Sequence, residues 1–305
     1  MIRLGLCCIF YEEPIKFRTT TAAYLSRSEK PYDHIDAIVR DNIQALLKAM
    51  TYCVLHNIGS FRINSQFLPL CSHPDWMYTL ADLPNGKEHL EEIEKCRLYR
   101  EEKGLRLVLH PDQFVVLNSP KKEVVESSIA ELTYHAMLAD LLEIDVINIH
   151  GGGVYGNKTE ALARLKSHYK SLDTSIKKRL TFENDDKSYT PSDLLPICNE
   201  LEAPFVYDVH HHRCLKDTML IQEVTEAALK TWNREPLFHI SSPLEGWEGS
   251  KPQRHHDFIN PDDFPDCWKS LSVTVEIEAK AKEVAIQKLQ TALEHRSVKL
   301  WKATT

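Results

Sequence analysis

The sequence lacks the signatures of several large classes of protein. Its eight cysteines include no C-x-x-C pair, which argues against a zinc or disulfide framework and favours buried free thiols. No apolar run approaches the roughly 20 residues that span a bilayer. The opening MIRLGLCCIF also has neither a basic segment nor a small-residue cleavage site. We therefore expect a cytoplasmic protein with no membrane partner.

An excess of positive charge is also absent. The formal net charge is −7 at pH 7, whereas a domain that binds nucleic acid is usually basic. Bound metal ions change this comparison, because three divalent cations would add about +6 and nearly cancel the deficit. The net charge therefore excludes a nucleic-acid substrate only if the carboxylates hold no metal.

What the chain does contain is a regular alternation of short apolar runs and helical patterns. With 305 residues, 43% of them hydrophobic, it can bury a sizeable core. The alternation predicts the α/β class and a single (β/α)8 TIM barrel over residues 1–305, which we expect to be a monomer. An open doubly wound sheet is the alternative, but no G-x-G-x-x-G follows the first run.

The predicted strands cover residues 2–8, 60–67, 105–110, 145–150, 179–185, 205–208, 236–243 and 273–280. The predicted helices cover residues 35–55, 87–102, 121–142, 159–172, 191–201, 220–232 and 281–295, with a short helical piece near 261–270.

Residues of metal-binding type stand where the third to eighth strands are predicted to end. They are His110, His150, Glu183, Asp208, His239 and Glu278. His, Asp and Glu make up roughly one residue in five, so six in succession has a chance probability on the order of 10⁻⁴. Because the carboxyl ends of barrel strands meet on one face, these side chains would gather in one pocket.

The run FVYDVHHHRC is the densest example, because Asp208 is followed at once by three histidines at 210–212. Taken alone, three adjacent histidines can be solvated loop residues. Mixed imidazoles and carboxylates suit Zn²⁺, Mn²⁺ or Fe²⁺ better than Mg²⁺ or Ca²⁺. Further candidate ligands are His211, His255, His256 and Asp257. Since these exceed what one ion needs, we expect two or three ions.

Nine motifs give the chain a specific resemblance to a known family. In order, they are FRINSQFLP, HPDQFVVLNSP, IAELTYHAMLADLL, NIHGGG, LTFEND, YDVHH, HISSP, HHDFI and IEAKAKE. In this order and spacing, from Ile2 to about Leu293, they resemble the UV damage endonuclease family, which belongs with the endonuclease IV barrels. The resemblance implies a DNA repair enzyme, usually manganese-dependent, that nicks damaged double-stranded DNA 5′ to UV photoproducts or other lesions. The phosphodiester would be attacked by a metal-activated hydroxide.

The resemblance also implies roles for individual residues. The ligands implied for one ion are His110, His150 and Glu183, and those for a second are Glu183, Asp208, His239 and Glu278. A third ion would be held by His211 with His255 or Asp257. Glu183 would bridge two ions and act in catalysis together with Lys280, which would steady the site or touch phosphate if the last strand stays extended. An ordinary solvated lysine is the alternative.

Gln113 and Phe114 match the amide and the aromatic residue that the family pushes into the duplex at the damaged step. An aromatic wedge is physically sensible, because unstacking a damaged step costs less than unstacking an intact one. Core packing beside Val115 is the alternative for Phe114. Arg62 and Asn64, which follow the second apolar run, are further candidates for DNA contact.

Three positions depart from the family pattern. Leu6 and Phe10 stand where the family tends to place a tyrosine and an asparagine that probe the lesion, and Leu237 stands where it usually carries a lysine. The ion ligands therefore match the family better than the residues that read damage. Three alternatives stay open: an apurinic or other phosphodiester endonuclease of the same barrel superfamily, a metal-dependent sugar isomerase, and a damage-binding module without catalysis.

Overall fold

Eight parallel strands form a closed barrel in the computed structural model, which describes residues 1–303. The strands pair in chain order, and β8 closes the barrel by pairing with β1. The strands are β1 (Ile2–Cys7), β2 (Ser60–Ile63), β3 (Arg106–Leu109), β4 (Ile147–His150), β5 (Leu180–Glu183), β6 (Phe205–Asp208), β7 (Leu237–Ile240) and β8 (Val273–Ile277). The predicted TIM barrel is confirmed. That it forms one domain over residues 1–305 stays a prediction, and residues 304–305 lie outside the described part.

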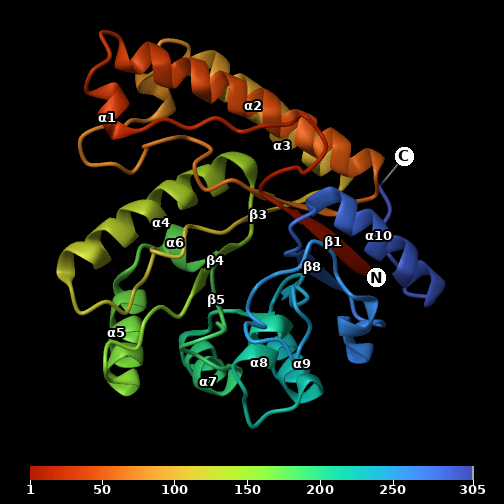
Figure 1. Cartoon of the computed structure of the whole chain (residues 1–305). Helices are drawn as coiled ribbons and strands as arrows, with labels where there is room; N and C mark the ends of the chain where they lie inside the picture. Colours follow the sequence, from red (N-terminus) through yellow and green to blue (C-terminus); the bar gives the residue numbers. More distant parts are fainter. Residues whose placement is uncertain (304–305) are drawn as a thin grey trace.

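Helices surround the strands on all sides (Figure 1). They are α1 (Ala22–Leu25), α2 (Pro31–Leu55), α3 (Gly86–Lys103), α4 (Lys122–Leu142), α5 (Lys158–Ser171), α6 (Thr174–Lys177), α7 (Pro191–Leu201), α8 (Val209–Cys214), α9 (Ile221–Lys230) and α10 (Lys282–His295). Three short 3₁₀ helices are η1 (Leu80–Asp82), η2 (Pro261–Asp263) and η3 (Asp266–Trp268). Local chemistry sets several boundaries. Pro31 begins α2, and Gly104 ends α3 with a left-handed φ of 63°.

Several strands end earlier than the sequence predicts, and β2, β7 and β8 do so by three or four residues. β2 ends at Ile63, because the Asn64 side chain accepts a hydrogen bond from the Gln66 N–H at 2.8 Å and turns the chain. β8 ends at Ile277, three residues before Lys280. The extended geometry that would place Lys280 on the same face as Glu278 is therefore not continued.

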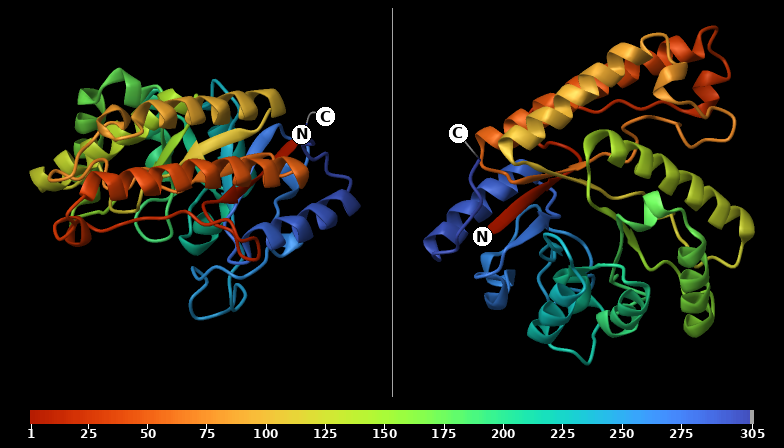
Figure 2. Two further views of the ribbon diagram at one scale, coloured as in Figure 1. Left: turned by 90° about the horizontal axis from the view of Figure 1, so that it is seen from above. Right: turned by 180° about the vertical axis from the view of Figure 1, so that it is seen from behind.

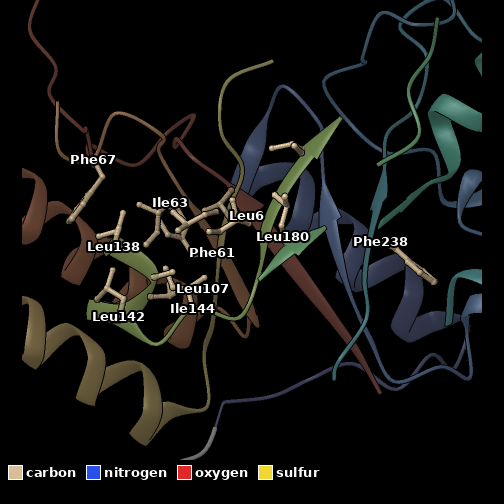
Figure 3. Close-up of a cluster of buried hydrophobic side chains, with 14 of the residues drawn as sticks. Leu6, Phe61, Ile63, Phe67, Leu107, Leu138, Leu142, Ile144, Leu180 and Phe238 are labelled. Carbon is tan, nitrogen blue, oxygen red and sulfur yellow. The ribbon is translucent and has the colours of Figure 1, made fainter. Parts of the chain in front are cut away.

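The hydrophobic core lies mainly between the barrel and its helices. On β8, Val273, Val275 and Ile277 point outward into this layer, while the residues between them point into the barrel. Figure 3 shows part of the same layer, where Leu107 of β3 lies beside Leu138 and Leu142 of α4. Alternation along each strand thus separates an apolar outer face from an inner face that is free to carry polar groups.

A second, smaller apolar cluster consists of fully buried Val108, Val146, Val206 and Leu237. Each of these residues precedes one of the predicted ligands by two or four positions, so it faces the barrel interior. Leu237, one of the departures from the family pattern, belongs to this layer. The predicted metal ligands therefore lie above a layer of four apolar side chains.

The segment that follows α10 returns to the start of β1, as the views in Figure 2 show. The Trp301 N–H donates to the Ile2 carbonyl at 2.7 Å, and Ile2 also forms a β-bridge with Leu300. Within residues 1–303, no helix is both long and apolar enough to cross a membrane.

Candidate metal centre

The residues at the ends of strands β3 to β8 meet at one mouth of the barrel. Their ligand atoms form three groups, and within each group all atoms lie within 4.8 Å of one another. The groups are His110, His150 and Glu183; Glu183, Asp208 and His211; and Asp208, His239 and Glu278. All six predicted strand-end residues are included, and Glu183 and Asp208 are each shared by two groups.

Strand register places these side chains at the same height. His150 on β4 pairs with Glu183 on β5, and Asp208 on β6 pairs with His239 on β7. Because paired residues on neighbouring parallel strands point in the same direction, each imidazole lies beside a carboxylate. The hydrogen-bonded register of the barrel therefore assembles the cluster.

Glu183 occupies the centre of the cluster and is buried. Its Oε1 lies 3.0 Å from His239 Nδ1, and its Oε2 lies 3.2 Å from His110 Nε2. The Asn148 side chain donates to the same Oε2 at 2.5 Å. Although burial opposes ionisation, His239 and His150 hold the pKa of Glu183 well below its usual value. A carboxylate with imidazoles at both oxygens is suited to being shared between two ions.

The net pKa shifts of the surrounding imidazoles differ in direction, although burial acts against the charge on each ring. Burial lowers the pKa of His150. Burial also acts against the charge on His239, but the nearby Glu183 carboxylate outweighs it and raises the pKa of His239 to about 10. Asp208 and Glu183 similarly raise the pKa of His211. Protons on these two imidazoles balance the carboxylates, a task that divalent cations would take over on binding.

Two ligand atoms support the fit of this donor set to metal ions. His150 Nδ1 and Asp208 Oδ2 are buried and have no hydrogen-bond partner among residues 1–303. A buried polar atom without a partner costs about 1–3 kcal/mol, so such atoms are rare unless water or an ion satisfies them. Both residues belong to the ligand groups. The mixture of nitrogen and oxygen donors suits a divalent transition metal.

The third predicted ligand set is only partly assembled. His255 Nδ1 lies 3.9 Å from Glu278 Oε2, at the edge of the cluster, and its ring centroid is 6.5 Å from that of His211. Asp257 is exposed and belongs to none of the three groups. Its place in a loop after β7, rather than at a strand end, leaves its side chain turned to solvent. The expectation that Asp257 joins the cluster is therefore corrected.

The three consecutive histidines form helix α8, so the solvated-loop alternative is wrong. The Asp208 side chain caps this helix by accepting a hydrogen bond from the His211 N–H at 2.7 Å. His210 is fully buried, with its ring 5.2 Å from that of Trp247. His212 Nδ1 lies 2.6 Å from the Tyr207 hydroxyl. Only His211 of the three reaches the ligand groups.

Arg62 lies inside the barrel, not on its surface. Its side chain donates from Nε to Glu276 Oε2 at 2.7 Å and from Nη2 to Glu278 Oε1 at 2.8 Å. The residue is only 8% exposed. Its neighbours Phe61 and Ile63 point outward into the core, so alternation along β2 turns Arg62 inward. This arrangement does not favour the predicted contact of Arg62 with DNA, which stays a prediction.

A cavity of about 620 Å³ opens beside the ligand cluster. Residues that line it include Gln113, Phe114, His150, Tyr155, His211 and Glu278. Phe114 is 76% exposed while Val115 is buried, so the core-packing alternative for Phe114 is wrong. Tyr155 is 46% exposed and was missed by sequence reasoning. The cavity therefore combines ligand atoms with exposed aromatic rings.

Lys280 and Asn64 lie outside the three ligand groups. Lys280 is exposed beyond the end of β8, and Asn64 is partly buried with its side chain bonded to the Gln66 backbone. Their predicted roles, phosphate or site support for Lys280 and DNA contact for Asn64, stay predictions.

Two buried polar residues beneath the cluster were also missed. Asn148 and Glu276 each precede a predicted ligand on the same strand by two positions, so period-two alternation could have identified them. Although burial opposes it, Arg62 and His239 lower the pKa of Glu276 to about 2. This carboxylate is therefore ionised, while only its Oε2 has hydrogen-bond partners among the described residues.

Comparison with known proteins is consistent with this geometry. The model of the UV-endonuclease UvdE family matches residues 2–303. The chain belongs to this family. A UV DNA damage endonuclease of Bacillus cereus (strain G9842) is 32% identical to it over 284 residues, covering 90% of this chain and 88% of the relative. A UV DNA damage endonuclease of Bacillus velezensis is 33% identical over 296 residues, covering 92% and 89%.

Solved structures agree with the UvdE assignment. The crystal structure of SacUVDE matches with a TM-score of 0.87 and 29% identity, covering 98% of this chain and all of that chain. Endonuclease IV from Thermus thermophilus matches with a TM-score of 0.61 at 15% identity, covering 96% of this chain and 99% of that one. A D-psicose 3-epimerase from Clostridium cellulolyticum matches at 0.58 and 12%, covering 97% and 99%. The last two share the fold alone, and the predicted family resemblance is confirmed.

The departures of this UvdE chain from the family pattern fall on packed positions. Leu6 is fully buried in the outer core, near Phe61 and Ile63 in Figure 3. Phe10 is partly buried, with its ring 6.1 Å from that of Phe61. Leu237 belongs to the small apolar cluster inside the barrel. These three side chains contribute to packing.

Proposed function

We propose that the protein is a metal-dependent DNA repair endonuclease that nicks duplex DNA 5′ to UV photoproducts or other lesions. The observation that carries this proposal is the set of three overlapping ligand groups linked by Glu183 and Asp208. The names of the UvdE relatives as UV DNA damage endonucleases support the choice of substrate.

Two or three divalent ions, with Mn²⁺ as the proposed metal, would be held by the clustered side chains. Zn²⁺ and Fe²⁺ are the alternatives that suit the same donors. The proposed ligands are His110, His150, Glu183, Asp208, His211, His239 and Glu278, with His255 at the edge. When bound, such ions supply an activated water for attack on the phosphodiester and neutralise the departing oxygen.

The protein's own residues would position the DNA. Phe114 projects from the loop after β3 at the rim of the cavity, and Gln113 lies beside it. We assign Phe114 the role of a wedge that enters the damaged step, where unstacking costs least. Tyr155, on the same rim, would stack on an unpaired base. Lys280 and Asn64 would contact the DNA backbone.

The substrate, the oligomeric state and the location of the protein complete the proposal. The partner would be damaged double-stranded DNA, and the protein would act as a monomer in the cytoplasm. Leu6 is buried and Phe10 is partly buried, so we do not assign either residue a contact with the lesion. The proposed lesions therefore include UV photoproducts, abasic sites and mismatches.

A nicking assay tests the proposal directly. Purified protein with Mn²⁺ is expected to convert ultraviolet-irradiated supercoiled plasmid to the open circular form, and to leave unirradiated plasmid intact. Chelator should abolish the reaction. Absence of nicking on irradiated, abasic and mismatched duplexes with every divalent metal would overturn the proposal. Binding of damaged duplex without cleavage would favour a binding module, and turnover of ketoses would favour an isomerase.

A further inference from the structure

His239 is held between two carboxylates on opposite sides of its ring. Its Nδ1 lies 3.0 Å from Glu183 Oε1 in the centre of the ligand cluster. Its Nε2 lies 2.9 Å from Glu276 Oε2 on the neighbouring strand β8. Both His239 and Glu276 are fully buried. The imidazole therefore connects the ligand cluster to a carboxylate that is not among the three ligand groups.

A histidine that binds a metal through one ring nitrogen usually donates the other N–H to a carboxylate, a carbonyl or water. That second hydrogen bond determines which nitrogen carries the proton and fixes the ring orientation. With the proton on Nε2, Glu276 Oε2 is the acceptor beside it, because Arg62 Nη2, 3.2 Å from the same nitrogen, can only donate. The lone pair on Nδ1 then faces the cluster. Glu276 is thus placed to select the form of His239 that can bind an ion.

We propose that Glu276 and Arg62 are positioning residues of the metal centre: Glu276 orients His239 toward the ions, and Arg62 holds Glu276 in that role. This inference rests on the proposed metal-dependent function and deepens it. Neither residue is assigned direct contact with the ions.

Arg62 forms hydrogen bonds to Glu276, on β8, and to Glu278, which directly follows Ile277 at the end of β8. Its Nε donates to Glu276 Oε2 at 2.7 Å and its Nη2 donates to Glu278 Oε1 at 2.8 Å. A guanidinium has donors in a fixed fork and stays charged, so it can hold two carboxylates at a set distance. It also balances the charge of Glu276, which would otherwise be a buried anion beside the anionic cluster.

Gly5 provides the space that this arrangement needs. Gly5 on β1 pairs directly with Glu276 on β8. A Cβ atom at position 5 would lie 3.1 Å from Glu276 Cγ and 3.3 Å from Ser60 Cβ, both tighter than ordinary contacts. A methyl group at this position would therefore require Glu276 or Ser60 to move by a few tenths of an ångström. It would disturb the contact of Glu276 with His239 without altering the carboxylate.

Metal binding in the absence of DNA tests the inference. Mn²⁺ titrations of metal-stripped protein, followed by electron paramagnetic resonance, give the number of ions and their affinities. For Glu276→Gln we expect the affinity of at least one ion to fall about 10- to 100-fold, the usual cost of losing an outer partner, with the number of bound ions unchanged. Arg62→Gln should behave similarly, and Arg62→Lys should recover part of the loss because it restores the charge.

Glu235→Gln is a matched control. Glu235 also forms an arginine pair, with Arg3 Nε at 2.9 Å, but it precedes β7 at the opposite end of the barrel. Its substitution should leave Mn²⁺ affinity unchanged even if it lowers thermal stability. If Glu276→Gln fails to fold, Gly5→Ala tests the same role by shifting Glu276. It should also weaken Mn²⁺ binding.

The outcomes separate this inference from the proposed function. If wild-type protein binds Mn²⁺ and Glu276→Gln or Gly5→Ala binds it equally well, the positioning role is overturned while the metal centre stands. Loss of one whole equivalent of Mn²⁺ in Glu276→Gln would also overturn it, because Glu276 would then be a direct ligand. If wild-type protein binds none of Mn²⁺, Zn²⁺ and Fe²⁺, both proposals fail together.

Discussion

Both ends of the barrel carry buried charged side chains, but the atoms left without a hydrogen-bond partner differ in kind. At the amino end, Arg106 donates to Asp145 at 2.8 Å, to Thr274 at 3.0 Å and to the Glu235 carbonyl at 2.8 Å. Beside it, Nε and Nη2 of Arg234 have no hydrogen-bond partner among residues 1–303. At the carboxyl end, one buried atom of each of three residues lacks a hydrogen-bond partner among residues 1–303. These atoms are His150 Nδ1, Asp208 Oδ2 and Glu276 Oε1.

The comparison shows how one barrel separates structural charges from possible ligand atoms. A guanidinium such as that of Arg106 or Arg234 can only donate, so it cannot hold a cation, whereas imidazole and carboxylate atoms without a partner can bind a metal ion. In a TIM barrel the carboxyl end is also where side chains from different strands converge. The two ends can be altered separately by substitution, and we expect the largest effect at the carboxyl end.

Glu183→Ala removes the carboxylate that two ligand groups share. We expect nicking of irradiated plasmid to fall on the order of a thousandfold or more, equivalent to at least about 4 kcal/mol of transition-state stabilisation. Rates measured at saturating Mn²⁺ check this, with circular dichroism to confirm folding. Retention of more than a tenth of the wild-type rate would show that the cluster is not the reactive centre.

Arg106→Met breaks the network at the opposite end. Arg106 is 8% exposed. Its loss removes the closer of the two guanidinium partners of Asp145 and leaves Arg234 Nε at 3.6 Å. We expect the free energy of unfolding to fall by about 3 kcal/mol, as measured by urea denaturation. The nicking rate of the folded protein should stay within about twofold of wild type. A large loss of nicking in folded protein would mean that the two ends are coupled.

His135 provides an imidazole on α4, outside the ligand groups. Burial lowers its pKa to about 4, whereas in the unfolded chain it is about 6.5. Between these values the unfolded state binds the proton more tightly, so this contribution to stability is complete above pH 6.5 and is lost as the pH falls toward 4.

Denaturation at two pH values tests this effect. We expect wild-type protein to lose about 2 kcal/mol more stability than His135→Gln between pH 7 and pH 5. Equal losses in the two proteins would contradict the lowered pKa. The difference between the two proteins gives the contribution to stability of a buried imidazole that lies outside the ligand groups, for comparison with those inside them.

Phe114→Ala should have the smallest effect. We expect damaged duplex to bind about tenfold more weakly, within the range for one stacking contact. The free energy of unfolding should change by no more than about 0.5 kcal/mol, because the ring is 76% exposed. Fluorescence anisotropy with a lesion duplex and Mn²⁺ measures the affinity, and Val115→Ala is a control that should alter stability instead.

The sequence by itself determined the barrel and most of the cluster. Periodicity is a local property, so apolar runs and helical spacing located the eight strands and the longer helices to within a few residues, but not the short helices α1, α6 and α8. The ends of six consecutive runs then indicated candidate ligands from His110 to Glu278, because strand ends converge in any closed parallel barrel. Local turn chemistry explains the differences, such as the early end of β2 at Asn64.

Only the tertiary structure decided the direction and the partners of individual side chains. Arg62 looked like a surface cation in sequence, yet alternation on β2 and the carboxylates of β8 hold it inside the barrel. Phe114 stands beside two buried valines but is exposed. Whether Asp257 reaches the cluster depends on the path of a loop. A side chain's partners lie on segments distant in the chain, so residue type and local spacing cannot specify them.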